Sequence, residues 1–303
     1  MTVLGCVLIA VTVASATQDV RREYIELHMG VAVRVVVYAA DDATARRAAR
    51  AAYARIAELE QIMSDYRPQS EVRRLASRAG AEVPVSEPLY AVLARALELA
   101  RLSDGAFDPT VGPFVALWRD ARRTGRLPER STLDSAAARA GWQKVHLDSA
   151  TRSVRLDVAG MEIDLGGIAK GYILDQARAE FYRQGVRRVL LEAGGDISAG
   201  DPPPGRAGWR VAGMPGGRTL ADAAVSTSGD TEQFVIINGV RYSHVVDPRT
   251  GLGVTSRRHA TVVAPDGATA DGLATALTVL DDERGTALLK SFPAVVAAVR
   301  PVP

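Results

Sequence analysis

The chain has 303 residues, of which 47% are hydrophobic and 24% are charged, and its formal net charge is +2. This balance is typical of a globular protein with one large domain or two closely packed ones, and it gives no general attraction to nucleic acid or to an anionic membrane. Aromatic residues make up only 5% of the chain, which argues against a stacking surface for single-stranded nucleic acid.

The first segment with a clear pattern is VLGCVLIAVTVASA, residues 3–16, which is uncharged and mostly apolar. It is shorter than the roughly 20 residues that a membrane-spanning helix needs, and its small-residue end fits cleavage after Ala16. The stretch VLGC also resembles a lipoprotein box with Cys6 as the lipid acceptor. We therefore expect residues 1–16 to be a signal peptide or lipoprotein-type leader of a protein exported to the cell envelope. The alternative is a buried N-terminal strand in a cytoplasmic protein.

The next segments predict a strand and two helices. Residues 24–39 are rich in β-branched residues and predict one strand. The following segment starts with the possible capping residues Asp41 and Asp42 and continues with apolar residues at helical spacing as far as residue 62. A second helix is predicted to begin at Ser86, with Pro88 in its first turn, and to stop at residues 104–105.

The second half of the chain alternates hairpins with helices. Residues 144–157 and 234–246 predict hairpins, the latter around Asn238–Gly239. The other predicted elements are a short strand at 161–165, a helix around Lys170, a strand and glycine turn at 187–197, a Pro- and Gly-rich loop around a short strand at 202–217, a strand at 258–264, a helix at 269–280 and a strand at 294–300. This order favours an α+β fold with mixed, largely antiparallel sheets packed with helices. We expect residues 22–303 to form a single domain, with two closely packed subdomains as the alternative.

Lys170 occupies an unusual position in the stretch DLGGIAKGYILDQA, residues 164–177. A lysine in the first turn of a helix faces the positive end of the helix dipole, which is unfavourable by about 0.3–1 kcal/mol. Exposed amides at a glycine-flanked helix start form an anion site, and a bound phosphate would reverse that penalty. The alternative is that Lys170 reaches solvent and the glycines only serve a tight turn.

Asp271 and Thr275 lie four residues apart in ADGLATAL and therefore share one helix face. A carboxylate and a hydroxyl placed in this way could both bind a hard cation such as Mg²⁺, which prefers oxygen ligands. The alternative is that Asp271 is only a first-turn acid that complements the helix dipole.

Three further stretches contain residues with possible chemical roles. His244 lies in RYSHVVDPRTG just before a turn, where it could act as a general acid or base or could be a structural residue. Asp108 lies in DGAFDPTVGPFVALW beside Phe107, where an acid and apolar groups could hold a heteroaromatic ring or could form a capped loop. Tyr66 in MSDYRPQSEVRRL could stack on a ring or belong to the core.

These stretches, in this order, resemble the ApbE family, the FAD:protein FMN transferases. The matches extend from residue 63 to residue 277, and seven stretches in register make the resemblance specific. They are MSDYRPQSEVRRL, GAFDPTVGPFVALW, DLGGIAKGYILD, LLEAGGDI, VSTSGD, YSHVVDPRTG and ADGLATAL. HMG at residues 28–30 is similar to the opening Met-Gly of the family, although Val31 stands where the family usually has threonine.

The resemblance implies a Mg²⁺-dependent enzyme that splits FAD at its pyrophosphate, transfers FMN to a threonine or serine hydroxyl of a target flavoprotein and releases AMP. It implies Mg²⁺ ligation by Asp271 and Thr275, with a backbone oxygen near Gly167 or Ala274, and proton transfer by His244. It implies FAD contacts at Met29, Tyr66, Ala106, Phe107, Asp108, Asp164, Lys170 and His244.

The identity of the acceptor stays open at this stage. Water as acceptor would make the protein an FAD pyrophosphatase, and the absence of turnover would make it an FAD carrier. The nearest match to the acceptor motif of the family, residues 265–270, lacks its spacing, so we expect the target to be a separate chain. In exported members of the family, targets include flavin-carrying subunits of membrane redox complexes.

Overall fold

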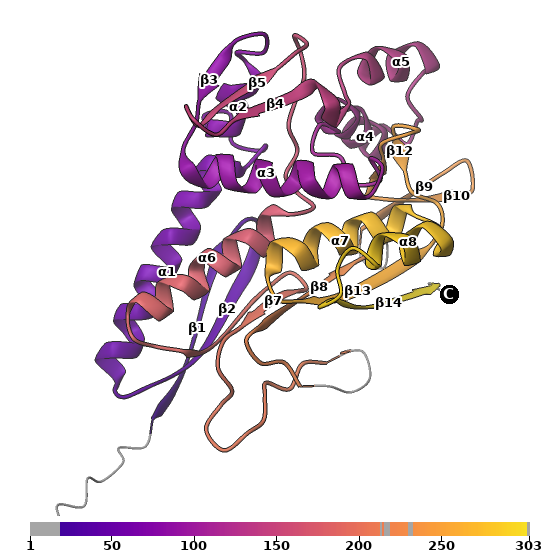
Figure 1. Ribbon diagram of the computed structural model, residues 1–303. Helices are drawn as coiled ribbons and strands as arrows, with labels where there is room; N and C mark the ends of the chain where they lie inside the picture. Colours follow the sequence, from indigo (N-terminus) through magenta and orange to yellow (C-terminus); the bar gives the residue numbers. More distant parts are fainter. Residues whose placement is uncertain (1–18, 213, 215–218, 230–232, 302–303) are drawn as a thin grey trace, which may run out of the picture.

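The fold is organised around one large antiparallel sheet (Figure 1). The computed structural model describes residues 19–212, 214, 219–229 and 233–301. Within these residues, seven strands pair in the order β1-β2-β6-β7-β8-β13-β14, and each neighbouring pair is antiparallel. The strands are β1 (Val20–His28), β2 (Val31–Ala39), β6 (Arg188–Ala193), β7 (Asp196–Ala199), β8 (Ala223–Ser228), β13 (Arg258–Ala264) and β14 (Val296–Pro301). The predicted α+β fold with largely antiparallel sheets is confirmed.

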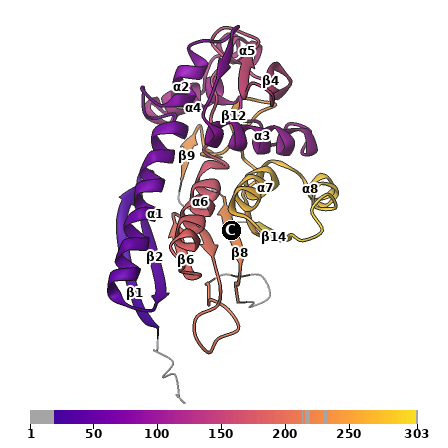
Figure 2. The ribbon, with the colours of Figure 1, turned by 60° about the vertical axis from the view of Figure 1, so that its left-hand side comes forward.

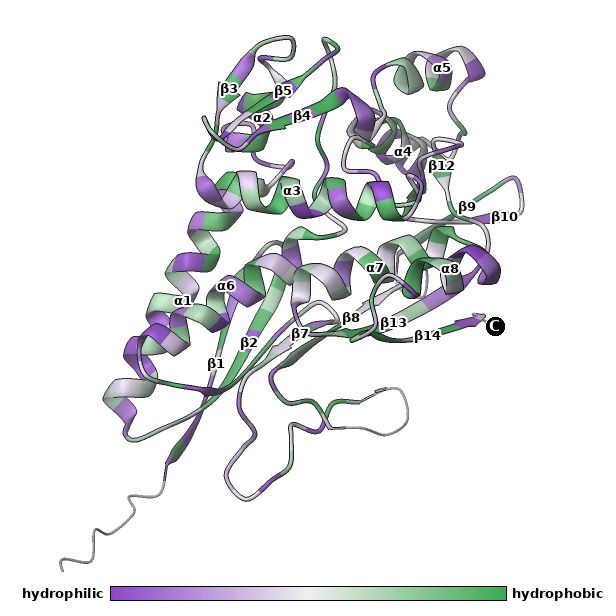
Figure 3. Cartoon of the chain, in the orientation of Figure 1, coloured by the Kyte–Doolittle hydropathy of each residue, from purple (hydrophilic) through white to green (hydrophobic). Residues whose placement is uncertain are grey.

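Helices cover one face of this sheet (Figure 1, Figure 2). They are α1 (Asp42–Met63), α6 (Ala169–Arg183), α7 (Gly267–Val279) and α8 (Asp282–Leu289). Apolar side chains alternate along the strands, so that Val33, Val35 and Val37 of β2 join the core beneath the helices. Banding by hydropathy along α1 reflects its amphipathic sequence (Figure 3).

The remaining elements form a second group above the helices in Figure 1. They are α2 (Glu71–Ala76), β3 (Glu82–Pro84), α3 (Glu87–Leu102), α4 (Gly112–Thr124), α5 (Arg130–Ala138), the 3₁₀ helix η1 (Trp142–Lys144), β4 (Val145–Asp148), β5 (Ser153–Leu156), β9 (Phe234–Ile237), β10 (Val240–Ser243), β11 (Val246–Asp247) and β12 (Leu252–Gly253). The main core extends into this group, because Leu89, Leu93 and Leu156 belong to the same buried cluster as the sheet.

The opposite face of the sheet has a smaller core. Val36 and Leu190, whose side chains point away from the helices, pack there with Trp209 and Leu220 from the segment between β7 and β8. Among the helices that the structure describes, none combines the length and the apolar character needed to cross a bilayer. The predicted leader, residues 1–16, lies outside the described residues.

Two predicted helix starts are confirmed by their caps. Asp41 caps α1 by accepting a hydrogen bond from the amide of Thr44 at 2.7 Å, and Ser86 caps α3. The hairpin of β9 and β10 turns at Asn238 and Gly239, whose φ angles are 51° and 78°. Positive φ at both positions matches the turn type that joins two-residue hairpins.

The prediction of one strand over residues 24–39 is wrong, because the chain reverses within it. Met29 and Gly30 have φ angles of 53° and 74° and form a two-residue turn between β1 and β2. Methionine rarely adopts positive φ, so the sequence contains only one of the two usual turn signals. The result is a hairpin with Met29 at its tip.

Two further predicted strands are also absent from the described residues. Residues 161–165 alternate as a strand would, with Met161, Ile163 and Leu165 buried, but no strand is assigned there. The segment instead connects to a loop, because the amide of Asp164 donates to the carbonyl of Pro109 at 2.8 Å. The short strand expected within 202–217 is reduced, in the part that the structure describes, to an isolated bridge between Trp209 and Leu220.

Candidate functional site

Lys170 points to a buried carboxylate. It is the second residue of α6, and its ammonium forms an ion pair with Asp196, the first residue of β7, which is 2% exposed. The hydroxyl of Ser226 on β8 donates to the other oxygen of Asp196. Burial alone would lower the pKa of Lys170, but the carboxylates of Asp271 and Asp196 outweigh it and hold the pKa above its ordinary value. The alternative that Lys170 only reaches solvent does not describe the site, because the ammonium is paired with Asp196 although 31% of the side chain is exposed.

Asp271 lies in the second turn of α7 and is only 3% exposed. Its Oδ2 accepts a hydrogen bond from the amide of Gly171 at 3.1 Å, so it is attached to the first turn of α6. Burial, with a further contribution from Asp196, raises the pKa of Asp271 to about 7. A buried acid in this position is not the exposed first-turn acid that the sequence left open. Two carboxylates beside one ammonium leave this cluster well suited to a further positive charge.

Thr275 and Gly167 bring two neutral oxygens together next to this cluster. Thr275 Oγ1 donates to the carbonyl of Gly167 at 3.5 Å. A Cβ on Gly167 would lie 2.9 Å from Thr275 Oγ1 and 3.2 Å from Cε2 of Phe107, so the loop can approach α7 this closely only with glycine. Ala274, the preceding residue of α7, is fully buried.

These oxygens suit a hard divalent cation. A carboxylate of Asp271, a hydroxyl of Thr275 and the peptide carbonyl of Gly167 are the kinds of ligand that Mg²⁺ takes, with the remaining positions left to water or phosphate. Among the described residues, no group of three or more His, Cys, Asp or Glu side chains gathers to hold a metal. The donor set thus fits magnesium, whereas its binding stays a prediction.

The loop of residues 103–111 lies against Gly167, just before the start of α6. Ala106 and Phe107 are each 4% exposed, and the contact with Gly167 places the Phe107 ring beside the start of α6. The carboxylate of Asp108 accepts from the amide and hydroxyl of Thr110 at 2.8 and 2.6 Å and from the amide of Trp142 at 3.1 Å. Burial raises the pKa of Asp108 above its ordinary value. Asp108 thus fixes its own loop, and its contact with FAD stays a prediction.

Asp164 and Tyr66 are connected through an arginine of α4. The guanidinium of Arg119 is hydrogen bonded to Asp65, lies 3.9 Å from Asp164 and stands 4.1 Å from the centre of the Tyr66 ring. Burial, then the neighbouring Asp65, raises the pKa of Asp164 to about 6. Tyr66 is 76% exposed, so the alternative that it belongs to the core is wrong, and its contact with FAD stays a prediction.

Met29 lies in the turn between β1 and β2, near the turn between β6 and β7 that precedes Asp196. A Cβ on Gly194 would lie 3.2 Å from Cγ1 of Val31, so the Met29–Gly30 turn neighbours the glycine turn before β7. This adjacency follows from the pairing of β2 with β6.

His244 follows β10 and is held by Gln233, whose carbonyl accepts from the His244 amide at 3.1 Å and lies 3.2 Å from the ring Nδ1. The preceding residue, Ser243, accepts from the indole of Trp118 on α4 at 3.1 Å. Helix α4 therefore supports the His244 segment through Trp118 and the Tyr66–Asp164 segments through Arg119. The predicted catalytic role of His244 stays a prediction.

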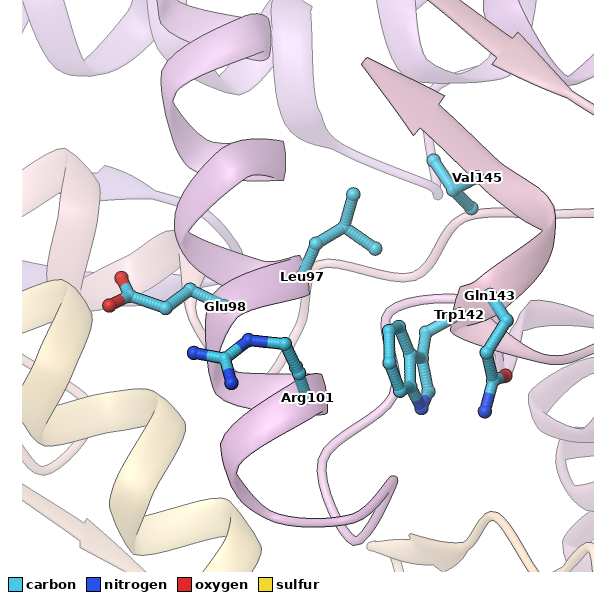
Figure 4. A pocket seen from close by; sticks show the side chains of 6 residues that line it. All are labelled: Leu97, Glu98, Arg101, Trp142, Gln143 and Val145. Atoms are coloured by element: carbon cyan, nitrogen blue, oxygen red, sulfur yellow. The ribbon is translucent and has the colours of Figure 1, made fainter. Parts of the chain in front are cut away.

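A surface cavity of about 400 Å³ lies behind the Asp108 loop, between α3 and η1. Figure 4 shows the Trp142 ring across from Leu97 and Arg101 of α3, with Glu98 pointing away from it. This cavity is lined by none of the predicted site residues. Its residue Trp142 donates a backbone hydrogen bond to Asp108 and lies against Gly105 of the same loop.

The comparisons with known proteins identify the family. The ApbE family profile matches residues 29–299. The chain belongs to the ApbE family. A relative from Treponema pallidum, named FAD:protein FMN transferase, is 35% identical, with 97% of this chain and 89% of the relative covered. A relative of the same name from Klebsiella pneumoniae is 31% identical over 88% of this chain and 85% of its own length.

Solved structures of ApbE proteins share the fold over nearly the whole chain. The ApbE protein of Thermotoga maritima has a TM-score of 0.81 at 31% identity, covering 93% of this chain and 96% of its own. The flavin transferase ApbE of Vibrio cholerae has the same TM-score at 28% identity, covering 92% and 93%. The family resemblance inferred from the seven sequence stretches is therefore confirmed.

Three residues that contact the predicted site residues, namely Asp196, Ser226 and Arg119, were not predicted from the sequence. Asp196 and Ser226 stand in LLEAGGDI and VSTSGD, two of the stretches that carry the family resemblance, but neither residue was predicted to belong to the site. An acid directly after a double glycine at a buried strand start is a signal that could have identified Asp196, because aspartate is seldom buried without a charged partner. Arg119 has no comparable sequence signal, since its partners come from two distant loops.

Proposed function

We propose that this protein transfers FMN from FAD to a threonine or serine hydroxyl of an acceptor protein. The hydroxyl oxygen attacks the phosphorus on the FMN side of the pyrophosphate, a new phosphoester bond forms, the bond to the bridging oxygen breaks, and AMP leaves. The observation that carries the proposal is the cluster of Lys170 with the buried acids Asp196 and Asp271, beside the oxygens of Gly167 and Thr275. The names and coverage of the relatives support the same activity.

Lys170, the second residue of α6, binds the phosphate on the FMN side. Gly166 and Gly167 leave that helix start without side-chain bulk, and Asp196 holds the lysine ammonium in one place. A positioned phosphate is kept in line with the attacking oxygen, and such positioning supplies several kcal/mol of rate enhancement, up to about 7–11 in favourable cases. Asp196 and Ser226 therefore affect the reaction indirectly, because they hold Lys170 in position.

Asp271, Thr275 and the Gly167 carbonyl would hold the magnesium ion. When bound, Mg²⁺ supplies positive charge that polarises the phosphoryl oxygens and offsets the charge that develops on the leaving group. Asp271 keeps its carboxylate aimed by accepting the Gly171 amide, and burial keeps water from competing for it.

His244 takes the proton of the incoming hydroxyl. An imidazole side chain can accept such a proton and release it again. The backbone of Gln233 orients the ring at one nitrogen. The test of this role is His244→Gln, which retains a polar side chain but not the base and is expected to slow transfer while FAD still binds.

The decisive experiment incubates the purified protein with FAD and Mg²⁺, with and without an acceptor flavoprotein subunit. After denaturing electrophoresis, in-gel flavin fluorescence on the acceptor, with AMP in stoichiometric yield, is the expected result. Free FMN without labelled acceptor would instead identify a pyrophosphatase, and unchanged FAD would identify a carrier.

The metal assignment is tested with Asp271→Ala, which is expected to abolish Mg²⁺-dependent AMP release. Asp282→Ala is the matched control, because the Asp282 side chain is 90% exposed on α8 and pairs only with Arg258 in the described contacts. Full activity of the Asp271 variant would remove the metal site from the proposal.

We also propose that the protein is exported and acts at the cell envelope, on a flavin-carrying subunit of a membrane redox complex. The support is the uncharged segment 3–16, which precedes the family match. Mass spectrometry of the mature N-terminus distinguishes cleavage after Ala16, lipidation at Cys6 and an intact cytoplasmic chain.

A further inference from the structure

Arg119 connects two segments that the family resemblance predicts to contact FAD. Asp65 and Tyr66 follow the end of α1, and Asp164 lies just before α6. The guanidinium of Arg119 contacts all three, by a hydrogen bond to Asp65, by its 3.9 Å approach to Asp164 and by stacking on Tyr66. One side chain of α4 thereby fixes the relative position of two loops that are about 100 residues apart in the chain.

Arg119 forms ion pairs with two acids, Asp65 and Asp164. The side chains of Asp65 and Asp164 are 15% and 13% exposed, whereas FAD carries a negatively charged pyrophosphate. Without a cation between them, two largely buried carboxylates would repel each other and a bound dinucleotide. Arg119 is the residue whose ion pairs reach both of these acids.

The geometric part concerns the ring of Tyr66. One face of this ring is covered by the planar guanidinium at 4.1 Å, while the residue as a whole remains 76% exposed. An exposed tyrosine supported on one face loses less conformational freedom when a second planar group stacks on the other. The exposed face thus suits one of the two ring systems of FAD.

We propose that Arg119 is a positioning residue of the FAD site, which holds the Tyr66 ring as a stacking platform and neutralises the Asp65–Asp164 pair. This inference depends on the proposed function, because it assumes that Tyr66 and Asp164 face the dinucleotide. Arg119 touches the supporting residues rather than the reacting atoms. It therefore sets FAD affinity and leaves the chemical step nearly unchanged.

The test compares Arg119→Ala and Arg119→Lys with Arg123→Ala. Arg123 lies on the same helix and forms an exposed ion pair with Asp120, so its loss controls for removing any arginine of α4. Arg119→Ala is expected to raise the dissociation constant and the KM for FAD on the order of 10-fold, with kcat within about 3-fold of the parent. Arg119→Lys keeps the charge without the planar stacking surface and is expected to recover part of the affinity. Arg123→Ala should match the parent.

A double-mutant cycle with Tyr66→Ala separates positioning from a merely structural role. If Arg119 acts through the ring, the Arg119→Ala and Tyr66→Ala losses in FAD affinity, measured by quenching of flavin fluorescence, are less than additive. Fully additive losses, or a lowered Tm with unchanged FAD affinity, would overturn the inference. An unmodified protein that binds FAD but neither cleaves nor transfers it would contradict the proposed function and leave the positioning role of Arg119 measurable.

Discussion

A Cβ built on Gly171 would lie 2.0 Å from the carbonyl oxygen of Gly267, so helices α6 and α7 touch through their backbones at this point. The reverse holds at Gly267, where a Cβ would lie 2.5 Å from the Gly171 carbonyl. This crossing sets the distance between Lys170, one residue before it on α6, and Asp271, one turn beyond it on α7. The close approach of the two glycines is therefore the structural basis of the candidate site.

Replacing Gly171 by alanine is expected to destabilise the protein. The added methyl group meets backbone rather than a flexible side chain, so α6 and α7 must separate, at a cost of about 1–3 kcal/mol or more. The free energy of unfolding, measured by urea denaturation, checks this. Gly125→Ala is the control, because no atom lies within 4 Å of its Cβ and only its φ of 69° is unfavourable. Equal losses in the two variants would contradict a backbone clash.

Thr275→Val is expected to weaken Mg²⁺ binding with little effect on folding. Valine keeps the branched shape of threonine, but it lacks the oxygen that faces the Gly167 carbonyl. The apparent Mg²⁺ constant for FAD cleavage should rise about 10-fold or more. The increase in Tm on addition of Mg²⁺ should shrink accordingly, which is a measurement independent of turnover.

Thr278→Val provides the matched control one turn further along α7. The Thr278 hydroxyl donates to the Thr275 carbonyl at 2.7 Å and so satisfies a helix carbonyl rather than the site. Its replacement should leave the Mg²⁺ dependence unchanged. A similar Mg²⁺ effect in both variants would show that the hydroxyl of Thr275 has no special role.

The sequence predicted the architecture because its signals are local. Asp41 and Ser86 as caps, Asn238–Gly239 as a turn and alternation in the strands each depend on residues a few positions apart. The missed reversal at Met29 and Gly30 shows the limit, since a turn without the usual residue types leaves a strand pattern intact. The buried alternation of residues 161–165 predicts burial correctly but not the presence of a neighbouring strand.

The site was predicted in parts, for a similar reason. Lys170, Asp271 and Thr275 stand in helical patterns whose geometry follows from the sequence, and the family resemblance placed them together. The partner of Lys170 is 26 residues away on β7, and the contact depends on which face of the sheet lies under α6. The contacts of Arg119 with Asp65 and Asp164 depend on how two loops pack against α4, and no sequence periodicity predicts this packing.

Asp196→Asn is expected to disturb the site through Lys170. The amide lacks the charge that holds the ammonium, and the lysine is then attracted mainly by Asp271, where it competes with Mg²⁺. Mg²⁺ affinity should fall about 10- to 100-fold, the range typical of residues that support a metal ligand. The measurement is a Mg²⁺ titration of AMP release, paired with the Mg²⁺-dependent change in Tm.

Ser226→Ala is expected to lower Mg²⁺ affinity in the same way, but less. It removes only the hydroxyl that donates to Asp196, so the ion pair with Lys170 remains. The loss of Mg²⁺ affinity should lie between those of the parent and Asp196→Asn. A larger loss in Ser226→Ala than in Asp196→Asn would contradict a chain of support that runs from Ser226 through Asp196 to Lys170.

Asp175→Asn is expected to change how stability depends on pH. Asp175 of α6 accepts from the amides of Gly267 and Ala268 at 2.6 and 3.2 Å, and it thereby caps the start of α7. Burial raises the pKa of Asp175 from 3.8 to about 6, despite the nearby Arg178. The folded state therefore holds a proton more tightly than the unfolded state does, and the free energy of unfolding contributed by this group falls as pH rises from about 4 to about 6.

The asparagine variant keeps an oxygen for both amides but cannot ionise, so this fall disappears. The difference in the free energy of unfolding between variant and parent should increase in favour of the variant between pH 4 and pH 6, by at most about 3 kcal/mol. Urea denaturation at half-unit pH intervals measures it. Asp164 and Asp271, whose pKa values are raised to about 6 and about 7, keep their own contributions in both proteins and cancel in the comparison. Parallel curves would mean that Asp175 titrates alike in the folded and unfolded chains, and that its charge at the α6–α7 contact is better stabilised than its burial implies.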